Sequence, residues 1–375
     1  MTPQMIDRLS NSSDETALQD LEQTMHHAVV ARPNGAETPP QQNKLRHVPV
    51  GTGPAYWGPG ELMTFLITGE ETNGAFFMAE ISVSPGGGTP PHIHSREDES
   101  FHLLEGMLTI QVGGDTITAS AGDFVYLPRG IAHSFKNTGH GCAKAVVLTT
   151  PAGLEGFFAE VFEPAADRSA PPPPASKELI DRALAAGPRY GLELLPQGIT
   201  GSITIHETMC KKEVSMSLQS INPCVNPADE TIRLGPIEVR FLITGENSSG
   251  TVAVFEAVVP AAQRLTAPAH SHDHYEETVY GIDGVLTWTV DDKLIDVGPG
   301  QALCIPRGAV HRFDNNGSED VKALCVVTPA ALGPQYFREA AEVIKAAAGG
   351  PPDRAKMVEI MLRHGLTPVP PPGQA

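Results

Sequence analysis

An eight-position motif that occurs twice limits the folds open to this chain of 375 residues. The motif reads His-x-His-x4-Glu-x6-Gly, followed by Pro-x-Gly-x2-His-x3-Asn. Each position recurs 178 residues later, from His92 to His270 and from Asn137 to Asn315. Self-similarity at a fixed separation predicts two domains of one fold and of similar size.

Short strand-like segments surround both copies of the motif. Residues 108–112 and 116–119 flank Gly113-Gly114-Asp115, and residues 286–290 and 293–297 flank Asp291-Asp292. A short turn of this composition between two alternating segments indicates a β-hairpin. Many short strands separated by Gly and Pro predict an antiparallel barrel or jelly roll.

The expected fold is therefore all-β, with two tandem jelly-roll barrels and a few peripheral helices. We expect helices at 176–186 and 352–363, and the first has Ser176 as a plausible N-cap. A further helix is expected at 16–31, within an N-terminal arm and linker at 1–45. The first barrel is then assigned to 46–198 and the second to 199–375.

The spacing within each motif predicts how its polar side chains converge. Residues i and i+2 of a strand point to the same face, so His92 and His94 project together into the barrel. Glu99 follows five residues after His94, so a bend at 95–98 must bring it back to that face. His133 follows a Pro-x-Gly turn and is expected to close the site from across the barrel.

Three imidazoles and one carboxylate are ligands that borderline divalent metals prefer. A lone histidine is more often an ordinary core or surface residue, and His102, His140 and His274, which have no counterpart in the other copy, are interpreted so. A quartet repeated in register instead predicts a metal site. Four protein ligands would leave two octahedral positions open. The predicted ligands are His92, His94, Glu99 and His133, and His270, His272, Glu277 and His311.

Net charge and the cysteine pattern limit the classes of binding partner and the kinds of covalent cross-link that we expect. The 26 Lys plus Arg against 44 Asp plus Glu give a net charge of −18, which disfavours nucleic acid and anionic membrane surfaces. The five cysteines are scattered and odd in number, so no disulfide framework is indicated. No segment has the apolar length of a signal peptide or spanning helix, and we expect a cytoplasmic protein without membrane contact.

The motifs resemble the two conserved motifs of the cupin superfamily, and their duplication resembles a bicupin. The resemblance covers roughly residues 50–165 and 225–340, and segments such as PPHIHSREDESFHLLEGMLTIQVGGD are most similar to the quercetin 2,3-dioxygenase-like branch. It implies double-stranded β-helix barrels and one divalent transition metal per domain. Iron is the first expectation, with manganese, nickel, cobalt, copper or zinc as alternatives. It also implies further assembly into a homo-oligomer.

Departures from related branches narrow the substrate class. Gentisate-type bicupins usually lack the Glu, whereas Glu99 and Glu277 are both present. Oxalate decarboxylases carry an Arg three residues before the first His, where this chain has Thr89 and Ala267. An uncharged, Pro-rich approach suits a neutral or aromatic ligand better than a small dianion.

The resemblance implies dioxygenation of an oxygenated aromatic or enol substrate by O2, with Glu99 or Glu277 as the catalytic base. Two alternatives stay open: a redox-neutral isomerase, decarboxylase or lyase, and a non-catalytic bicupin that binds small molecules. The second site has more polar and aromatic neighbours, namely Tyr275, Glu276, Tyr280 and Trp288. We therefore expect His270→Ala to cost more activity than His92→Ala.

Overall fold

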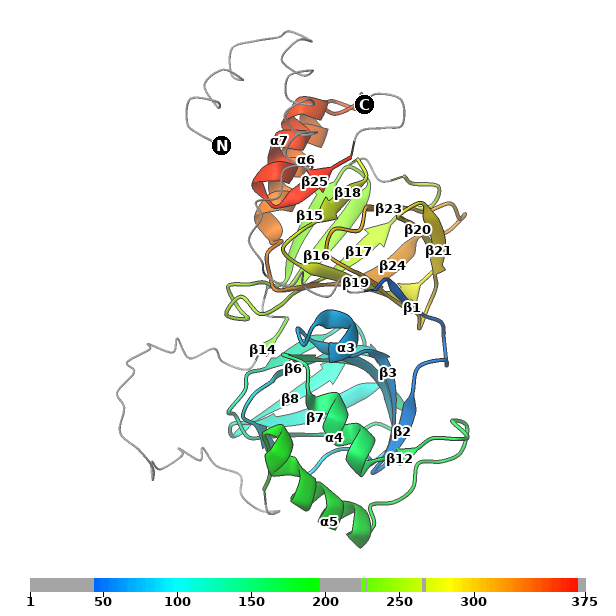
Figure 1. Ribbon diagram of the computed structural model, residues 1–375, viewed down its shortest axis with the longest axis vertical. Coiled ribbons are helices and arrows are strands. Elements are labelled where there is room, and N and C mark those ends of the chain that lie inside the picture. The colour runs from blue at the N-terminus through cyan, green and yellow to red at the C-terminus, as the bar shows by residue number, and fades with distance from the viewer. Residues whose placement is uncertain (1–43, 196–223, 227, 265–267, 370–375) are drawn as a thin grey trace, which may run out of the picture. The chain divides into compact units, whose positions relative to one another are not determined.

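The computed structural model describes residues 44–195, 224–226, 228–264 and 268–369. The helix expected at 16–31 and the domain boundary expected at 198/199 lie outside these residues. Within them, each repeat folds into a barrel of two facing sheets (Figure 1), and the strand pairs of those sheets are antiparallel. The predicted fold class, all-β with two tandem barrels and a few peripheral helices, is confirmed.

The first barrel has a larger and a smaller sheet, with a core of apolar side chains between them. The larger sheet has the order β12 (Glu163–Pro164), β2 (Ala55–Gly58), β3 (Glu61–Ile67), β4 (Phe77–Val83), β11 (Ala143–Thr150), β6 (Asp98–Glu105), β9 (Phe124–Leu127) and β14 (Cys224–Val225). The smaller has the order β13 (Leu192–Leu194), β5 (His92–His94), β10 (His133–Lys136), β7 (Met107–Val112) and β8 (Asp115–Ser120).

The second barrel repeats this arrangement. Its larger sheet has the order β1 (Arg46–Val48), β22 (Ala302–Ile305), β19 (Glu276–Asp283), β24 (Val321–Thr328), β17 (Ala253–Val259), β16 (Ile237–Ile243) and β15 (Glu230–Leu234). The smaller has the order β21 (Lys293–Val297), β20 (Leu286–Val290), β23 (His311–Asp314), β18 (His270–His272) and β25 (Leu366–Pro368).

Both predicted hairpins are present, as β7–β8 and β20–β21. Each turn needs two consecutive residues at positive φ. Gly113 and Gly114 supply φ of 59° and 109° in the first turn, and Asp291 and Asp292 supply 44° and 63° in the second. Gly and Asp are among the residues that tolerate this region best, which explains why composition alone located these turns.

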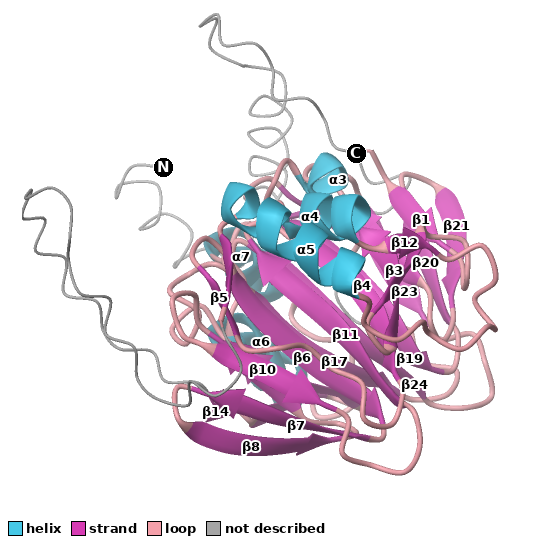
Figure 2. Cartoon of the chain, turned by 90° about the horizontal axis from the view of Figure 1, so that it is seen from below, coloured by secondary structure: helices cyan, strands magenta, loops and turns pink. Residues whose placement is uncertain are grey.

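One short helix, α3 (Gly69–Thr72), connects β3 to β4, and the other helices follow the main strands of each barrel. They are α4 (Leu154–Val161), α5 (Lys177–Ala186), the 3-10 turn η1 (Gly187–Tyr190), α6 (Pro334–Ala346) and α7 (Arg354–Arg363). Ser176 caps α5 by accepting a hydrogen bond from the Leu179 amide at 3.1 Å, as expected. The helix expected at 352–363 begins slightly later, because Asp353 is its N-cap. Figure 2 shows α4 and α5 side by side over the first barrel.

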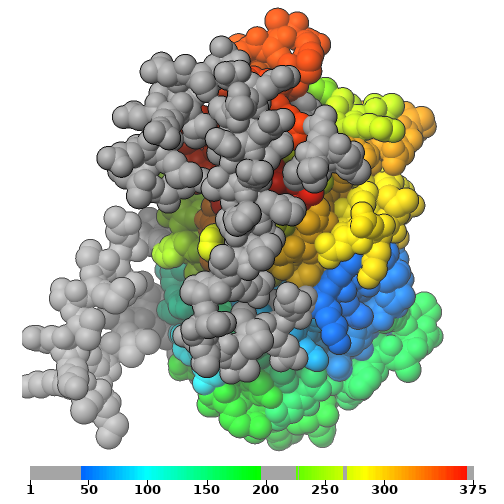
Figure 3. Space-filling view, turned by 45° about the horizontal axis from the view of Figure 1, so that its top comes forward, coloured from blue at the N-terminus to red at the C-terminus, as the bar shows by residue number. Residues whose placement is uncertain are grey.

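The two repeats exchange their first strands. Strand β1 pairs with β22 of the second repeat, and β14 pairs with β9 of the first. The blue atoms of the earliest described residues accordingly lie against yellow atoms of the second repeat in Figure 3. A further core cluster joins apolar side chains of both repeats, among them Phe76, Phe124, Tyr126, Tyr280 and Leu324. No helix in the described part of the chain is long and apolar enough to cross a membrane.

Candidate metal centre

Two strands and one bend bring the first predicted quartet together. His92 on β5 is the register partner of His133 on β10, so these rings lie side by side on the smaller sheet. Residues 95–97 then carry the chain to β6 in the larger sheet, where Glu99 lies. The bend predicted before Glu99 is confirmed. The expectation that His133 closes the site from across the barrel is wrong, because Glu99 is the residue from the facing sheet.

The four side chains of the first quartet are buried, and their ligand atoms lie within 4.8 Å of one another. The ring centroids of His92 and His133 are 4.4 Å apart, and those of His94 and His133 are 5.1 Å apart. The Glu99 Oε2 atom lies 3.0 Å from His133 Nε2 and 3.8 Å from His94 Nε2. This spacing leaves room for one ion bound to all four groups.

Hydrogen bonds to backbone carbonyls set the tautomers of two rings. Nδ1 of His92 is 2.8 Å from the Pro90 oxygen, and Nδ1 of His133 is 2.9 Å from the Ile131 oxygen. A carbonyl oxygen only accepts, so each Nδ1 carries the hydrogen and a neutral ring keeps its Nε2 lone pair. Outer partners of this kind are typical of metal-binding histidines.

Burial favours the neutral form of His92 and His94. Burial, followed by the neighbouring His133, lowers the pKa of His94 to about 3, and burial likewise lowers the pKa of His92 well below its usual value. Both nitrogens of His94 lack a hydrogen-bond partner among the described residues. Nitrogen lone pairs that converge beside the Glu99 carboxylate can bind a divalent cation. A cation suits them better than protons on His92 and His94, whose pKa values are lowered.

The second cluster repeats the three imidazoles, but its glutamate does not converge with all three of them. His270, His272 and His311 place their ligand atoms within 4.8 Å of one another. Nδ1 of His270 and of His311 bond to the Pro268 and Ala309 oxygens at 3.1 and 3.0 Å. Glu277 Oε2 is 3.5 Å from His272 Nε2 and 3.3 Å from His311 Nε2 but is not within 4.8 Å of all three rings. Burial lowers the pKa of His270 to about 4 and lowers the pKa of His272 well below its usual value.

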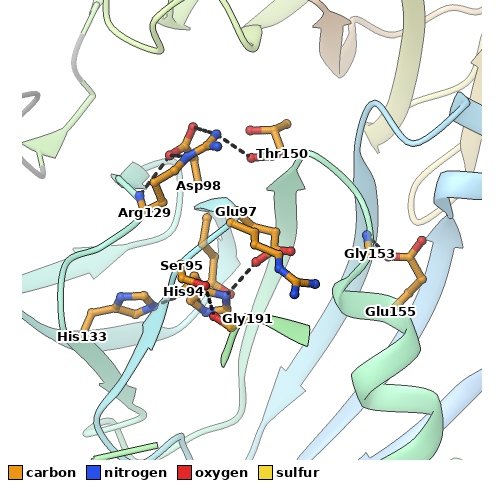
Figure 4. A network of polar contacts seen from close by, with 12 residues as sticks. His94, Ser95, Glu97, Asp98, Arg129, His133, Thr150, Gly153, Glu155 and Gly191 are labelled. Atoms are coloured by element: carbon orange, nitrogen blue, oxygen red, sulfur yellow. Dashed lines mark hydrogen bonds and ion pairs between the residues drawn. The ribbon is translucent and has the colours of Figure 1, made fainter. Parts of the chain in front are cut away.

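An ion pair holds the start of the strand that carries each glutamate. Arg129 donates from Nε to Asp98 Oδ1 at 3.0 Å and from Nη2 to Oδ2 at 2.9 Å, as Figure 4 shows. Arg307 and Glu276 form the equivalent pair in the second repeat, at 2.9 Å. A two-point guanidinium–carboxylate contact fixes direction as well as distance. It therefore orients the first residues of β6 and β19.

A second carboxyl approaches the first cluster from outside. Glu97 Oε2 lies 3.9 Å from His94 Nδ1 (Figure 4), and burial raises the pKa of Glu97 to about 7. The aligned residue of the second repeat is Tyr275, which stacks on His272 with ring centroids 4.2 Å apart. The two clusters thus differ in what supports their middle histidine.

The cavities beside the two clusters differ greatly in size. The first holds about 650 Å³ and the second about 90 Å³. Small-molecule sites commonly measure ~300–1,000 Å³, so the first cavity alone is in that range. Its walls come from both sheets and from the helices after the barrel, with Phe101, Phe135, Phe157, Phe158, Met63 and Leu179 among the lining residues.

Several aromatic side chains belong to the core and do not line either of these cavities. Phe124 and Tyr126 belong to the core cluster between the repeats. Tyr280 also lies there and donates a hydrogen bond to Glu80 of the first repeat. Trp288 lines the small second cavity, but Tyr275, Glu276 and Tyr280 are not among its lining residues. Three of the four residues behind the expectation that the second site is the more active one are therefore not among the lining residues of its cavity, and that expectation stays a prediction.

Sequence reasoning missed several polar residues that line the first cavity, and Glu61 is the buried carboxyl among them. Glu61 on β3 is 2% exposed and lines the cavity wall. Its strand alternates between the buried Glu61, Met63 and Phe65 and half-buried residues between them, so the sequence contained the signal that a carboxylate faces the core. His102, by contrast, belongs to neither cluster, and its Nε2 is 3.4 Å from Glu256 Oε1.

Comparisons with known proteins agree with this architecture. The Cupin domain family matches residues 79–149 and 258–327. Quercetin 2,3-dioxygenase of Bacillus subtilis is 24% identical over 297 residues, which are 77% of this chain and 83% of that protein. Protein SchB of Streptomyces halstedii is 34% identical over 99 residues, covering 26% of this chain and 69% of SchB. The Lactobacillus farciminis oxalate decarboxylase–formate complex has a TM-score of 0.50 at 17% identity, covering 79% of this chain and 88% of that chain.

Proposed function

The chain belongs to the cupin superfamily and carries two cupin domains, and from this premise we propose that it is a metal-dependent dioxygenase whose reaction occurs in the first domain. The proposed substrate is an oxygenated aromatic or enol compound, together with O2. One observation carries the proposal: four convergent ligand atoms lie beside a largely apolar cavity of about 650 Å³. The similarity to quercetin 2,3-dioxygenase supports the substrate class.

In this proposal His92, His94, Glu99 and His133 hold a divalent transition metal in the first domain, iron being the first candidate. The bound metal would supply Lewis-acid and one-electron redox chemistry. The apolar walls, including Phe101 and Phe135, bind the substrate ring and exclude water from it. Their burial also strengthens each polar interaction within the cavity.

Glu99 is proposed to accept the proton of the substrate hydroxyl at Oε2. This oxygen is 3.0 Å from His133 Nε2, and Glu99 is buried at the cavity wall. A positioned carboxylate within hydrogen-bond reach of the hydroxyl can contribute ~10²–10⁴-fold to the rate. Removal of the proton makes the ring or enol more electron-rich and hence more reactive toward O2.

The second domain is proposed to bind a metal through His270, His272, His311 and Glu277. Its cavity of about 90 Å³ is too small for an aromatic substrate as it stands. Glu277, predicted as a second catalytic base, is therefore proposed to be a metal ligand of a site that stabilises the fold.

Oxygen uptake by metal-replete protein tests the proposal. The protein is loaded separately with Fe(II), Mn(II), Co(II) or Ni(II), and its metal content is determined by elemental analysis. A panel of flavonols, catechols and simple enols is then supplied under air. We expect substrate-dependent O2 uptake, with both atoms of labelled O2 recovered in the product.

Paired variants assign the reaction to one site. His92→Ala should lower uptake by at least ~100-fold, while His270→Ala should retain most of it, although each variant loses metal from one site. The reverse order would place the reaction in the second domain. No uptake with any panel member would contradict the dioxygenase, and turnover under anaerobic conditions would instead support an isomerase, decarboxylase or lyase.

A further inference from the structure

A buried carboxyl, that of Glu61, lies in the wall of the first cavity. Glu61 is 2% exposed, and its Oε2 atom has no hydrogen-bond partner among the described residues. Buried polar atoms in folded proteins are nearly all hydrogen-bonded, because burying a polar atom without a hydrogen-bond partner is destabilising. The protein therefore retains a destabilising group at the edge of an open space.

The second repeat shows that the fold does not need this carboxyl. FLITGE occurs at 65–70 and again at 241–246, and the same offset aligns Glu61 with Ile237. Strands β3 and β16 share one burial pattern, so the two side chains occupy equivalent inward positions. An apolar residue thus fills this position where the cavity is small, and a carboxyl lines it where the cavity is large.

Glu61 lines the cavity, and close neighbours leave little free space on another side of its carboxyl. On one side Gly58 is so close that a Cβ there would lie 2.9 Å from Glu61 Oε1 and 2.6 Å from the Phe162 ring. Met63, Ile81 and Phe162 are among the other residues that line this cavity. Burial, and to a lesser degree the Glu99 carboxylate, raises the pKa of Glu61 to about 8. No basic side chain is among the causes of that shift.

We propose that Glu61 is a specificity-determining residue of the first site, and that it forms a hydrogen bond to a substrate hydroxyl other than the one nearest Glu99. The inference rests on the proposed function in taking the first site as the substrate site, and it narrows the substrate to a polyhydroxylated aromatic. A ligand hydroxyl would complete the hydrogen bonding that the protein leaves unmet, whereas a ligand without it would leave Glu61 unpaired. Sites built this way discriminate strongly against analogues that lack the matching group.

Anaerobic binding tests this inference without relying on turnover. Calorimetry is performed on the metal-loaded full chain with two probes, a flavonol bearing several phenolic hydroxyls and 3-hydroxyflavone, which has a single hydroxyl. Glu61→Ile, which introduces the residue of the second repeat, should weaken binding of the polyhydroxylated probe by about 10- to 100-fold and change 3-hydroxyflavone by less than about 3-fold. Glu61→Gln should retain most of the affinity, because its amide offers a donor and an acceptor.

Controls separate binding from folding. Glu61→Ile should keep its metal content and melt at a higher temperature, since it removes the unpaired carboxyl. Glu105→Ile makes the same substitution at an exposed position of the same sheet and should leave both affinities unchanged.

Equal losses for the two probes, or no loss for either, would overturn the role of Glu61. Selective loss in a protein that consumes no O2 would uphold the role of Glu61 while the proposed dioxygenase fails. The two proposals therefore fail on different measurements.

Discussion

At the scale of single residues, one buried amide holds the end of each second motif. Asn137 is 1% exposed, and its Nδ2 donates to the oxygens of Val83 and Gly141, both at 2.8 Å. Its Oδ1 accepts from the Gly139 amide at 2.9 Å. Asn315 makes the equivalent bonds to Val259, Glu319 and Gly317. Each asparagine therefore ties the turn after a histidine strand to the facing sheet.

Asn137→Asp should destabilise the protein by ~3 kcal/mol or more. The change keeps the shape but replaces two donated hydrogen bonds by a carboxylate oxygen facing two carbonyls. The free energy of unfolding is measured in urea at neutral pH. Asn73→Asp, at an exposed left-handed position that either residue tolerates, should change it by less than ~0.5 kcal/mol. Equal effects would show that the buried amide is not needed.

At the scale of elements, the helices after each barrel affect how much space remains beside each histidine cluster. In the second repeat α6 places Tyr336, Phe337, Ala340 and Ile344 along the cavity. The Phe337 ring lies 5.4 Å from that of Phe241 and 5.3 Å from that of Phe255. In the first repeat α4 is shorter, and Phe158 is only partly buried beside the open cavity. Packing of one helix thus distinguishes a filled barrel from a hollow one.

Phe337→Ala should cost ~3–5 kcal/mol of unfolding free energy, the usual range for deleting a buried Phe ring. Phe158→Ala should cost less, ~1–2 kcal/mol, because its ring already borders a cavity, but it should weaken binding of an aromatic ligand. Chemical denaturation gives both losses, and calorimetry with 3-hydroxyflavone gives the affinity. A larger stability loss for Phe158→Ala would contradict this account of the helices.

At the scale of the whole described molecule, polar contacts across the repeats occur in matched pairs. His102 of the first repeat meets Glu256 and, through it, Lys322 of the second, with Lys322 Nζ 2.6 Å from Glu256 Oε1. Tyr280 of the second repeat likewise meets Glu80, which is 3.2 Å from Lys144. The exchanged strands β1 and β14 show the same reciprocity. Each repeat therefore contributes an edge strand and a polar partner to the other repeat.

His102 should make stability depend on pH. Burial lowers its pKa to about 4, against opposing attraction from Glu256, while Lys322 and Arg240 lower it further and Asp123 raises it. Between pH 6.5 and pH 4 the unfolded chain binds a proton that the folded chain excludes, so stability falls as the pH falls through this window. The contribution is at most ~3 kcal/mol.

The measurement compares His102→Gln with the unmodified chain by urea denaturation at pH 8, 6 and 4.5. If His102 gives the higher free energy of unfolding at pH 8, the free energies of the two proteins should converge toward low pH. Only the protein with the histidine loses stability at this position on acidification. A constant difference at all three values would show that His102 does not titrate in this window.

The candidate metal ligands could be predicted because the motif that contains them has a fixed spacing and occurs twice. A spacing of two residues puts His92 and His94 on one face, and exact repetition made chance an unlikely source of the pattern. The strand pairing that brings His133 to His92 joins distant segments, and the motif alone assigned that histidine to the wrong side of the barrel.

The sequence by itself determined the two-barrel fold, the hairpins, the predicted α5 cap and the residues able to hold a metal, because each depends on periodicity or on near neighbours along the chain. Only the tertiary structure decided that one cavity is about 650 Å³ and the other about 90 Å³, and that Glu61 Oε2, beside the larger cavity, has no hydrogen-bond partner in the described part of the chain. Those features depend on how helices and both sheets fill a shared volume, and packing density between distant segments leaves no mark in local spacing.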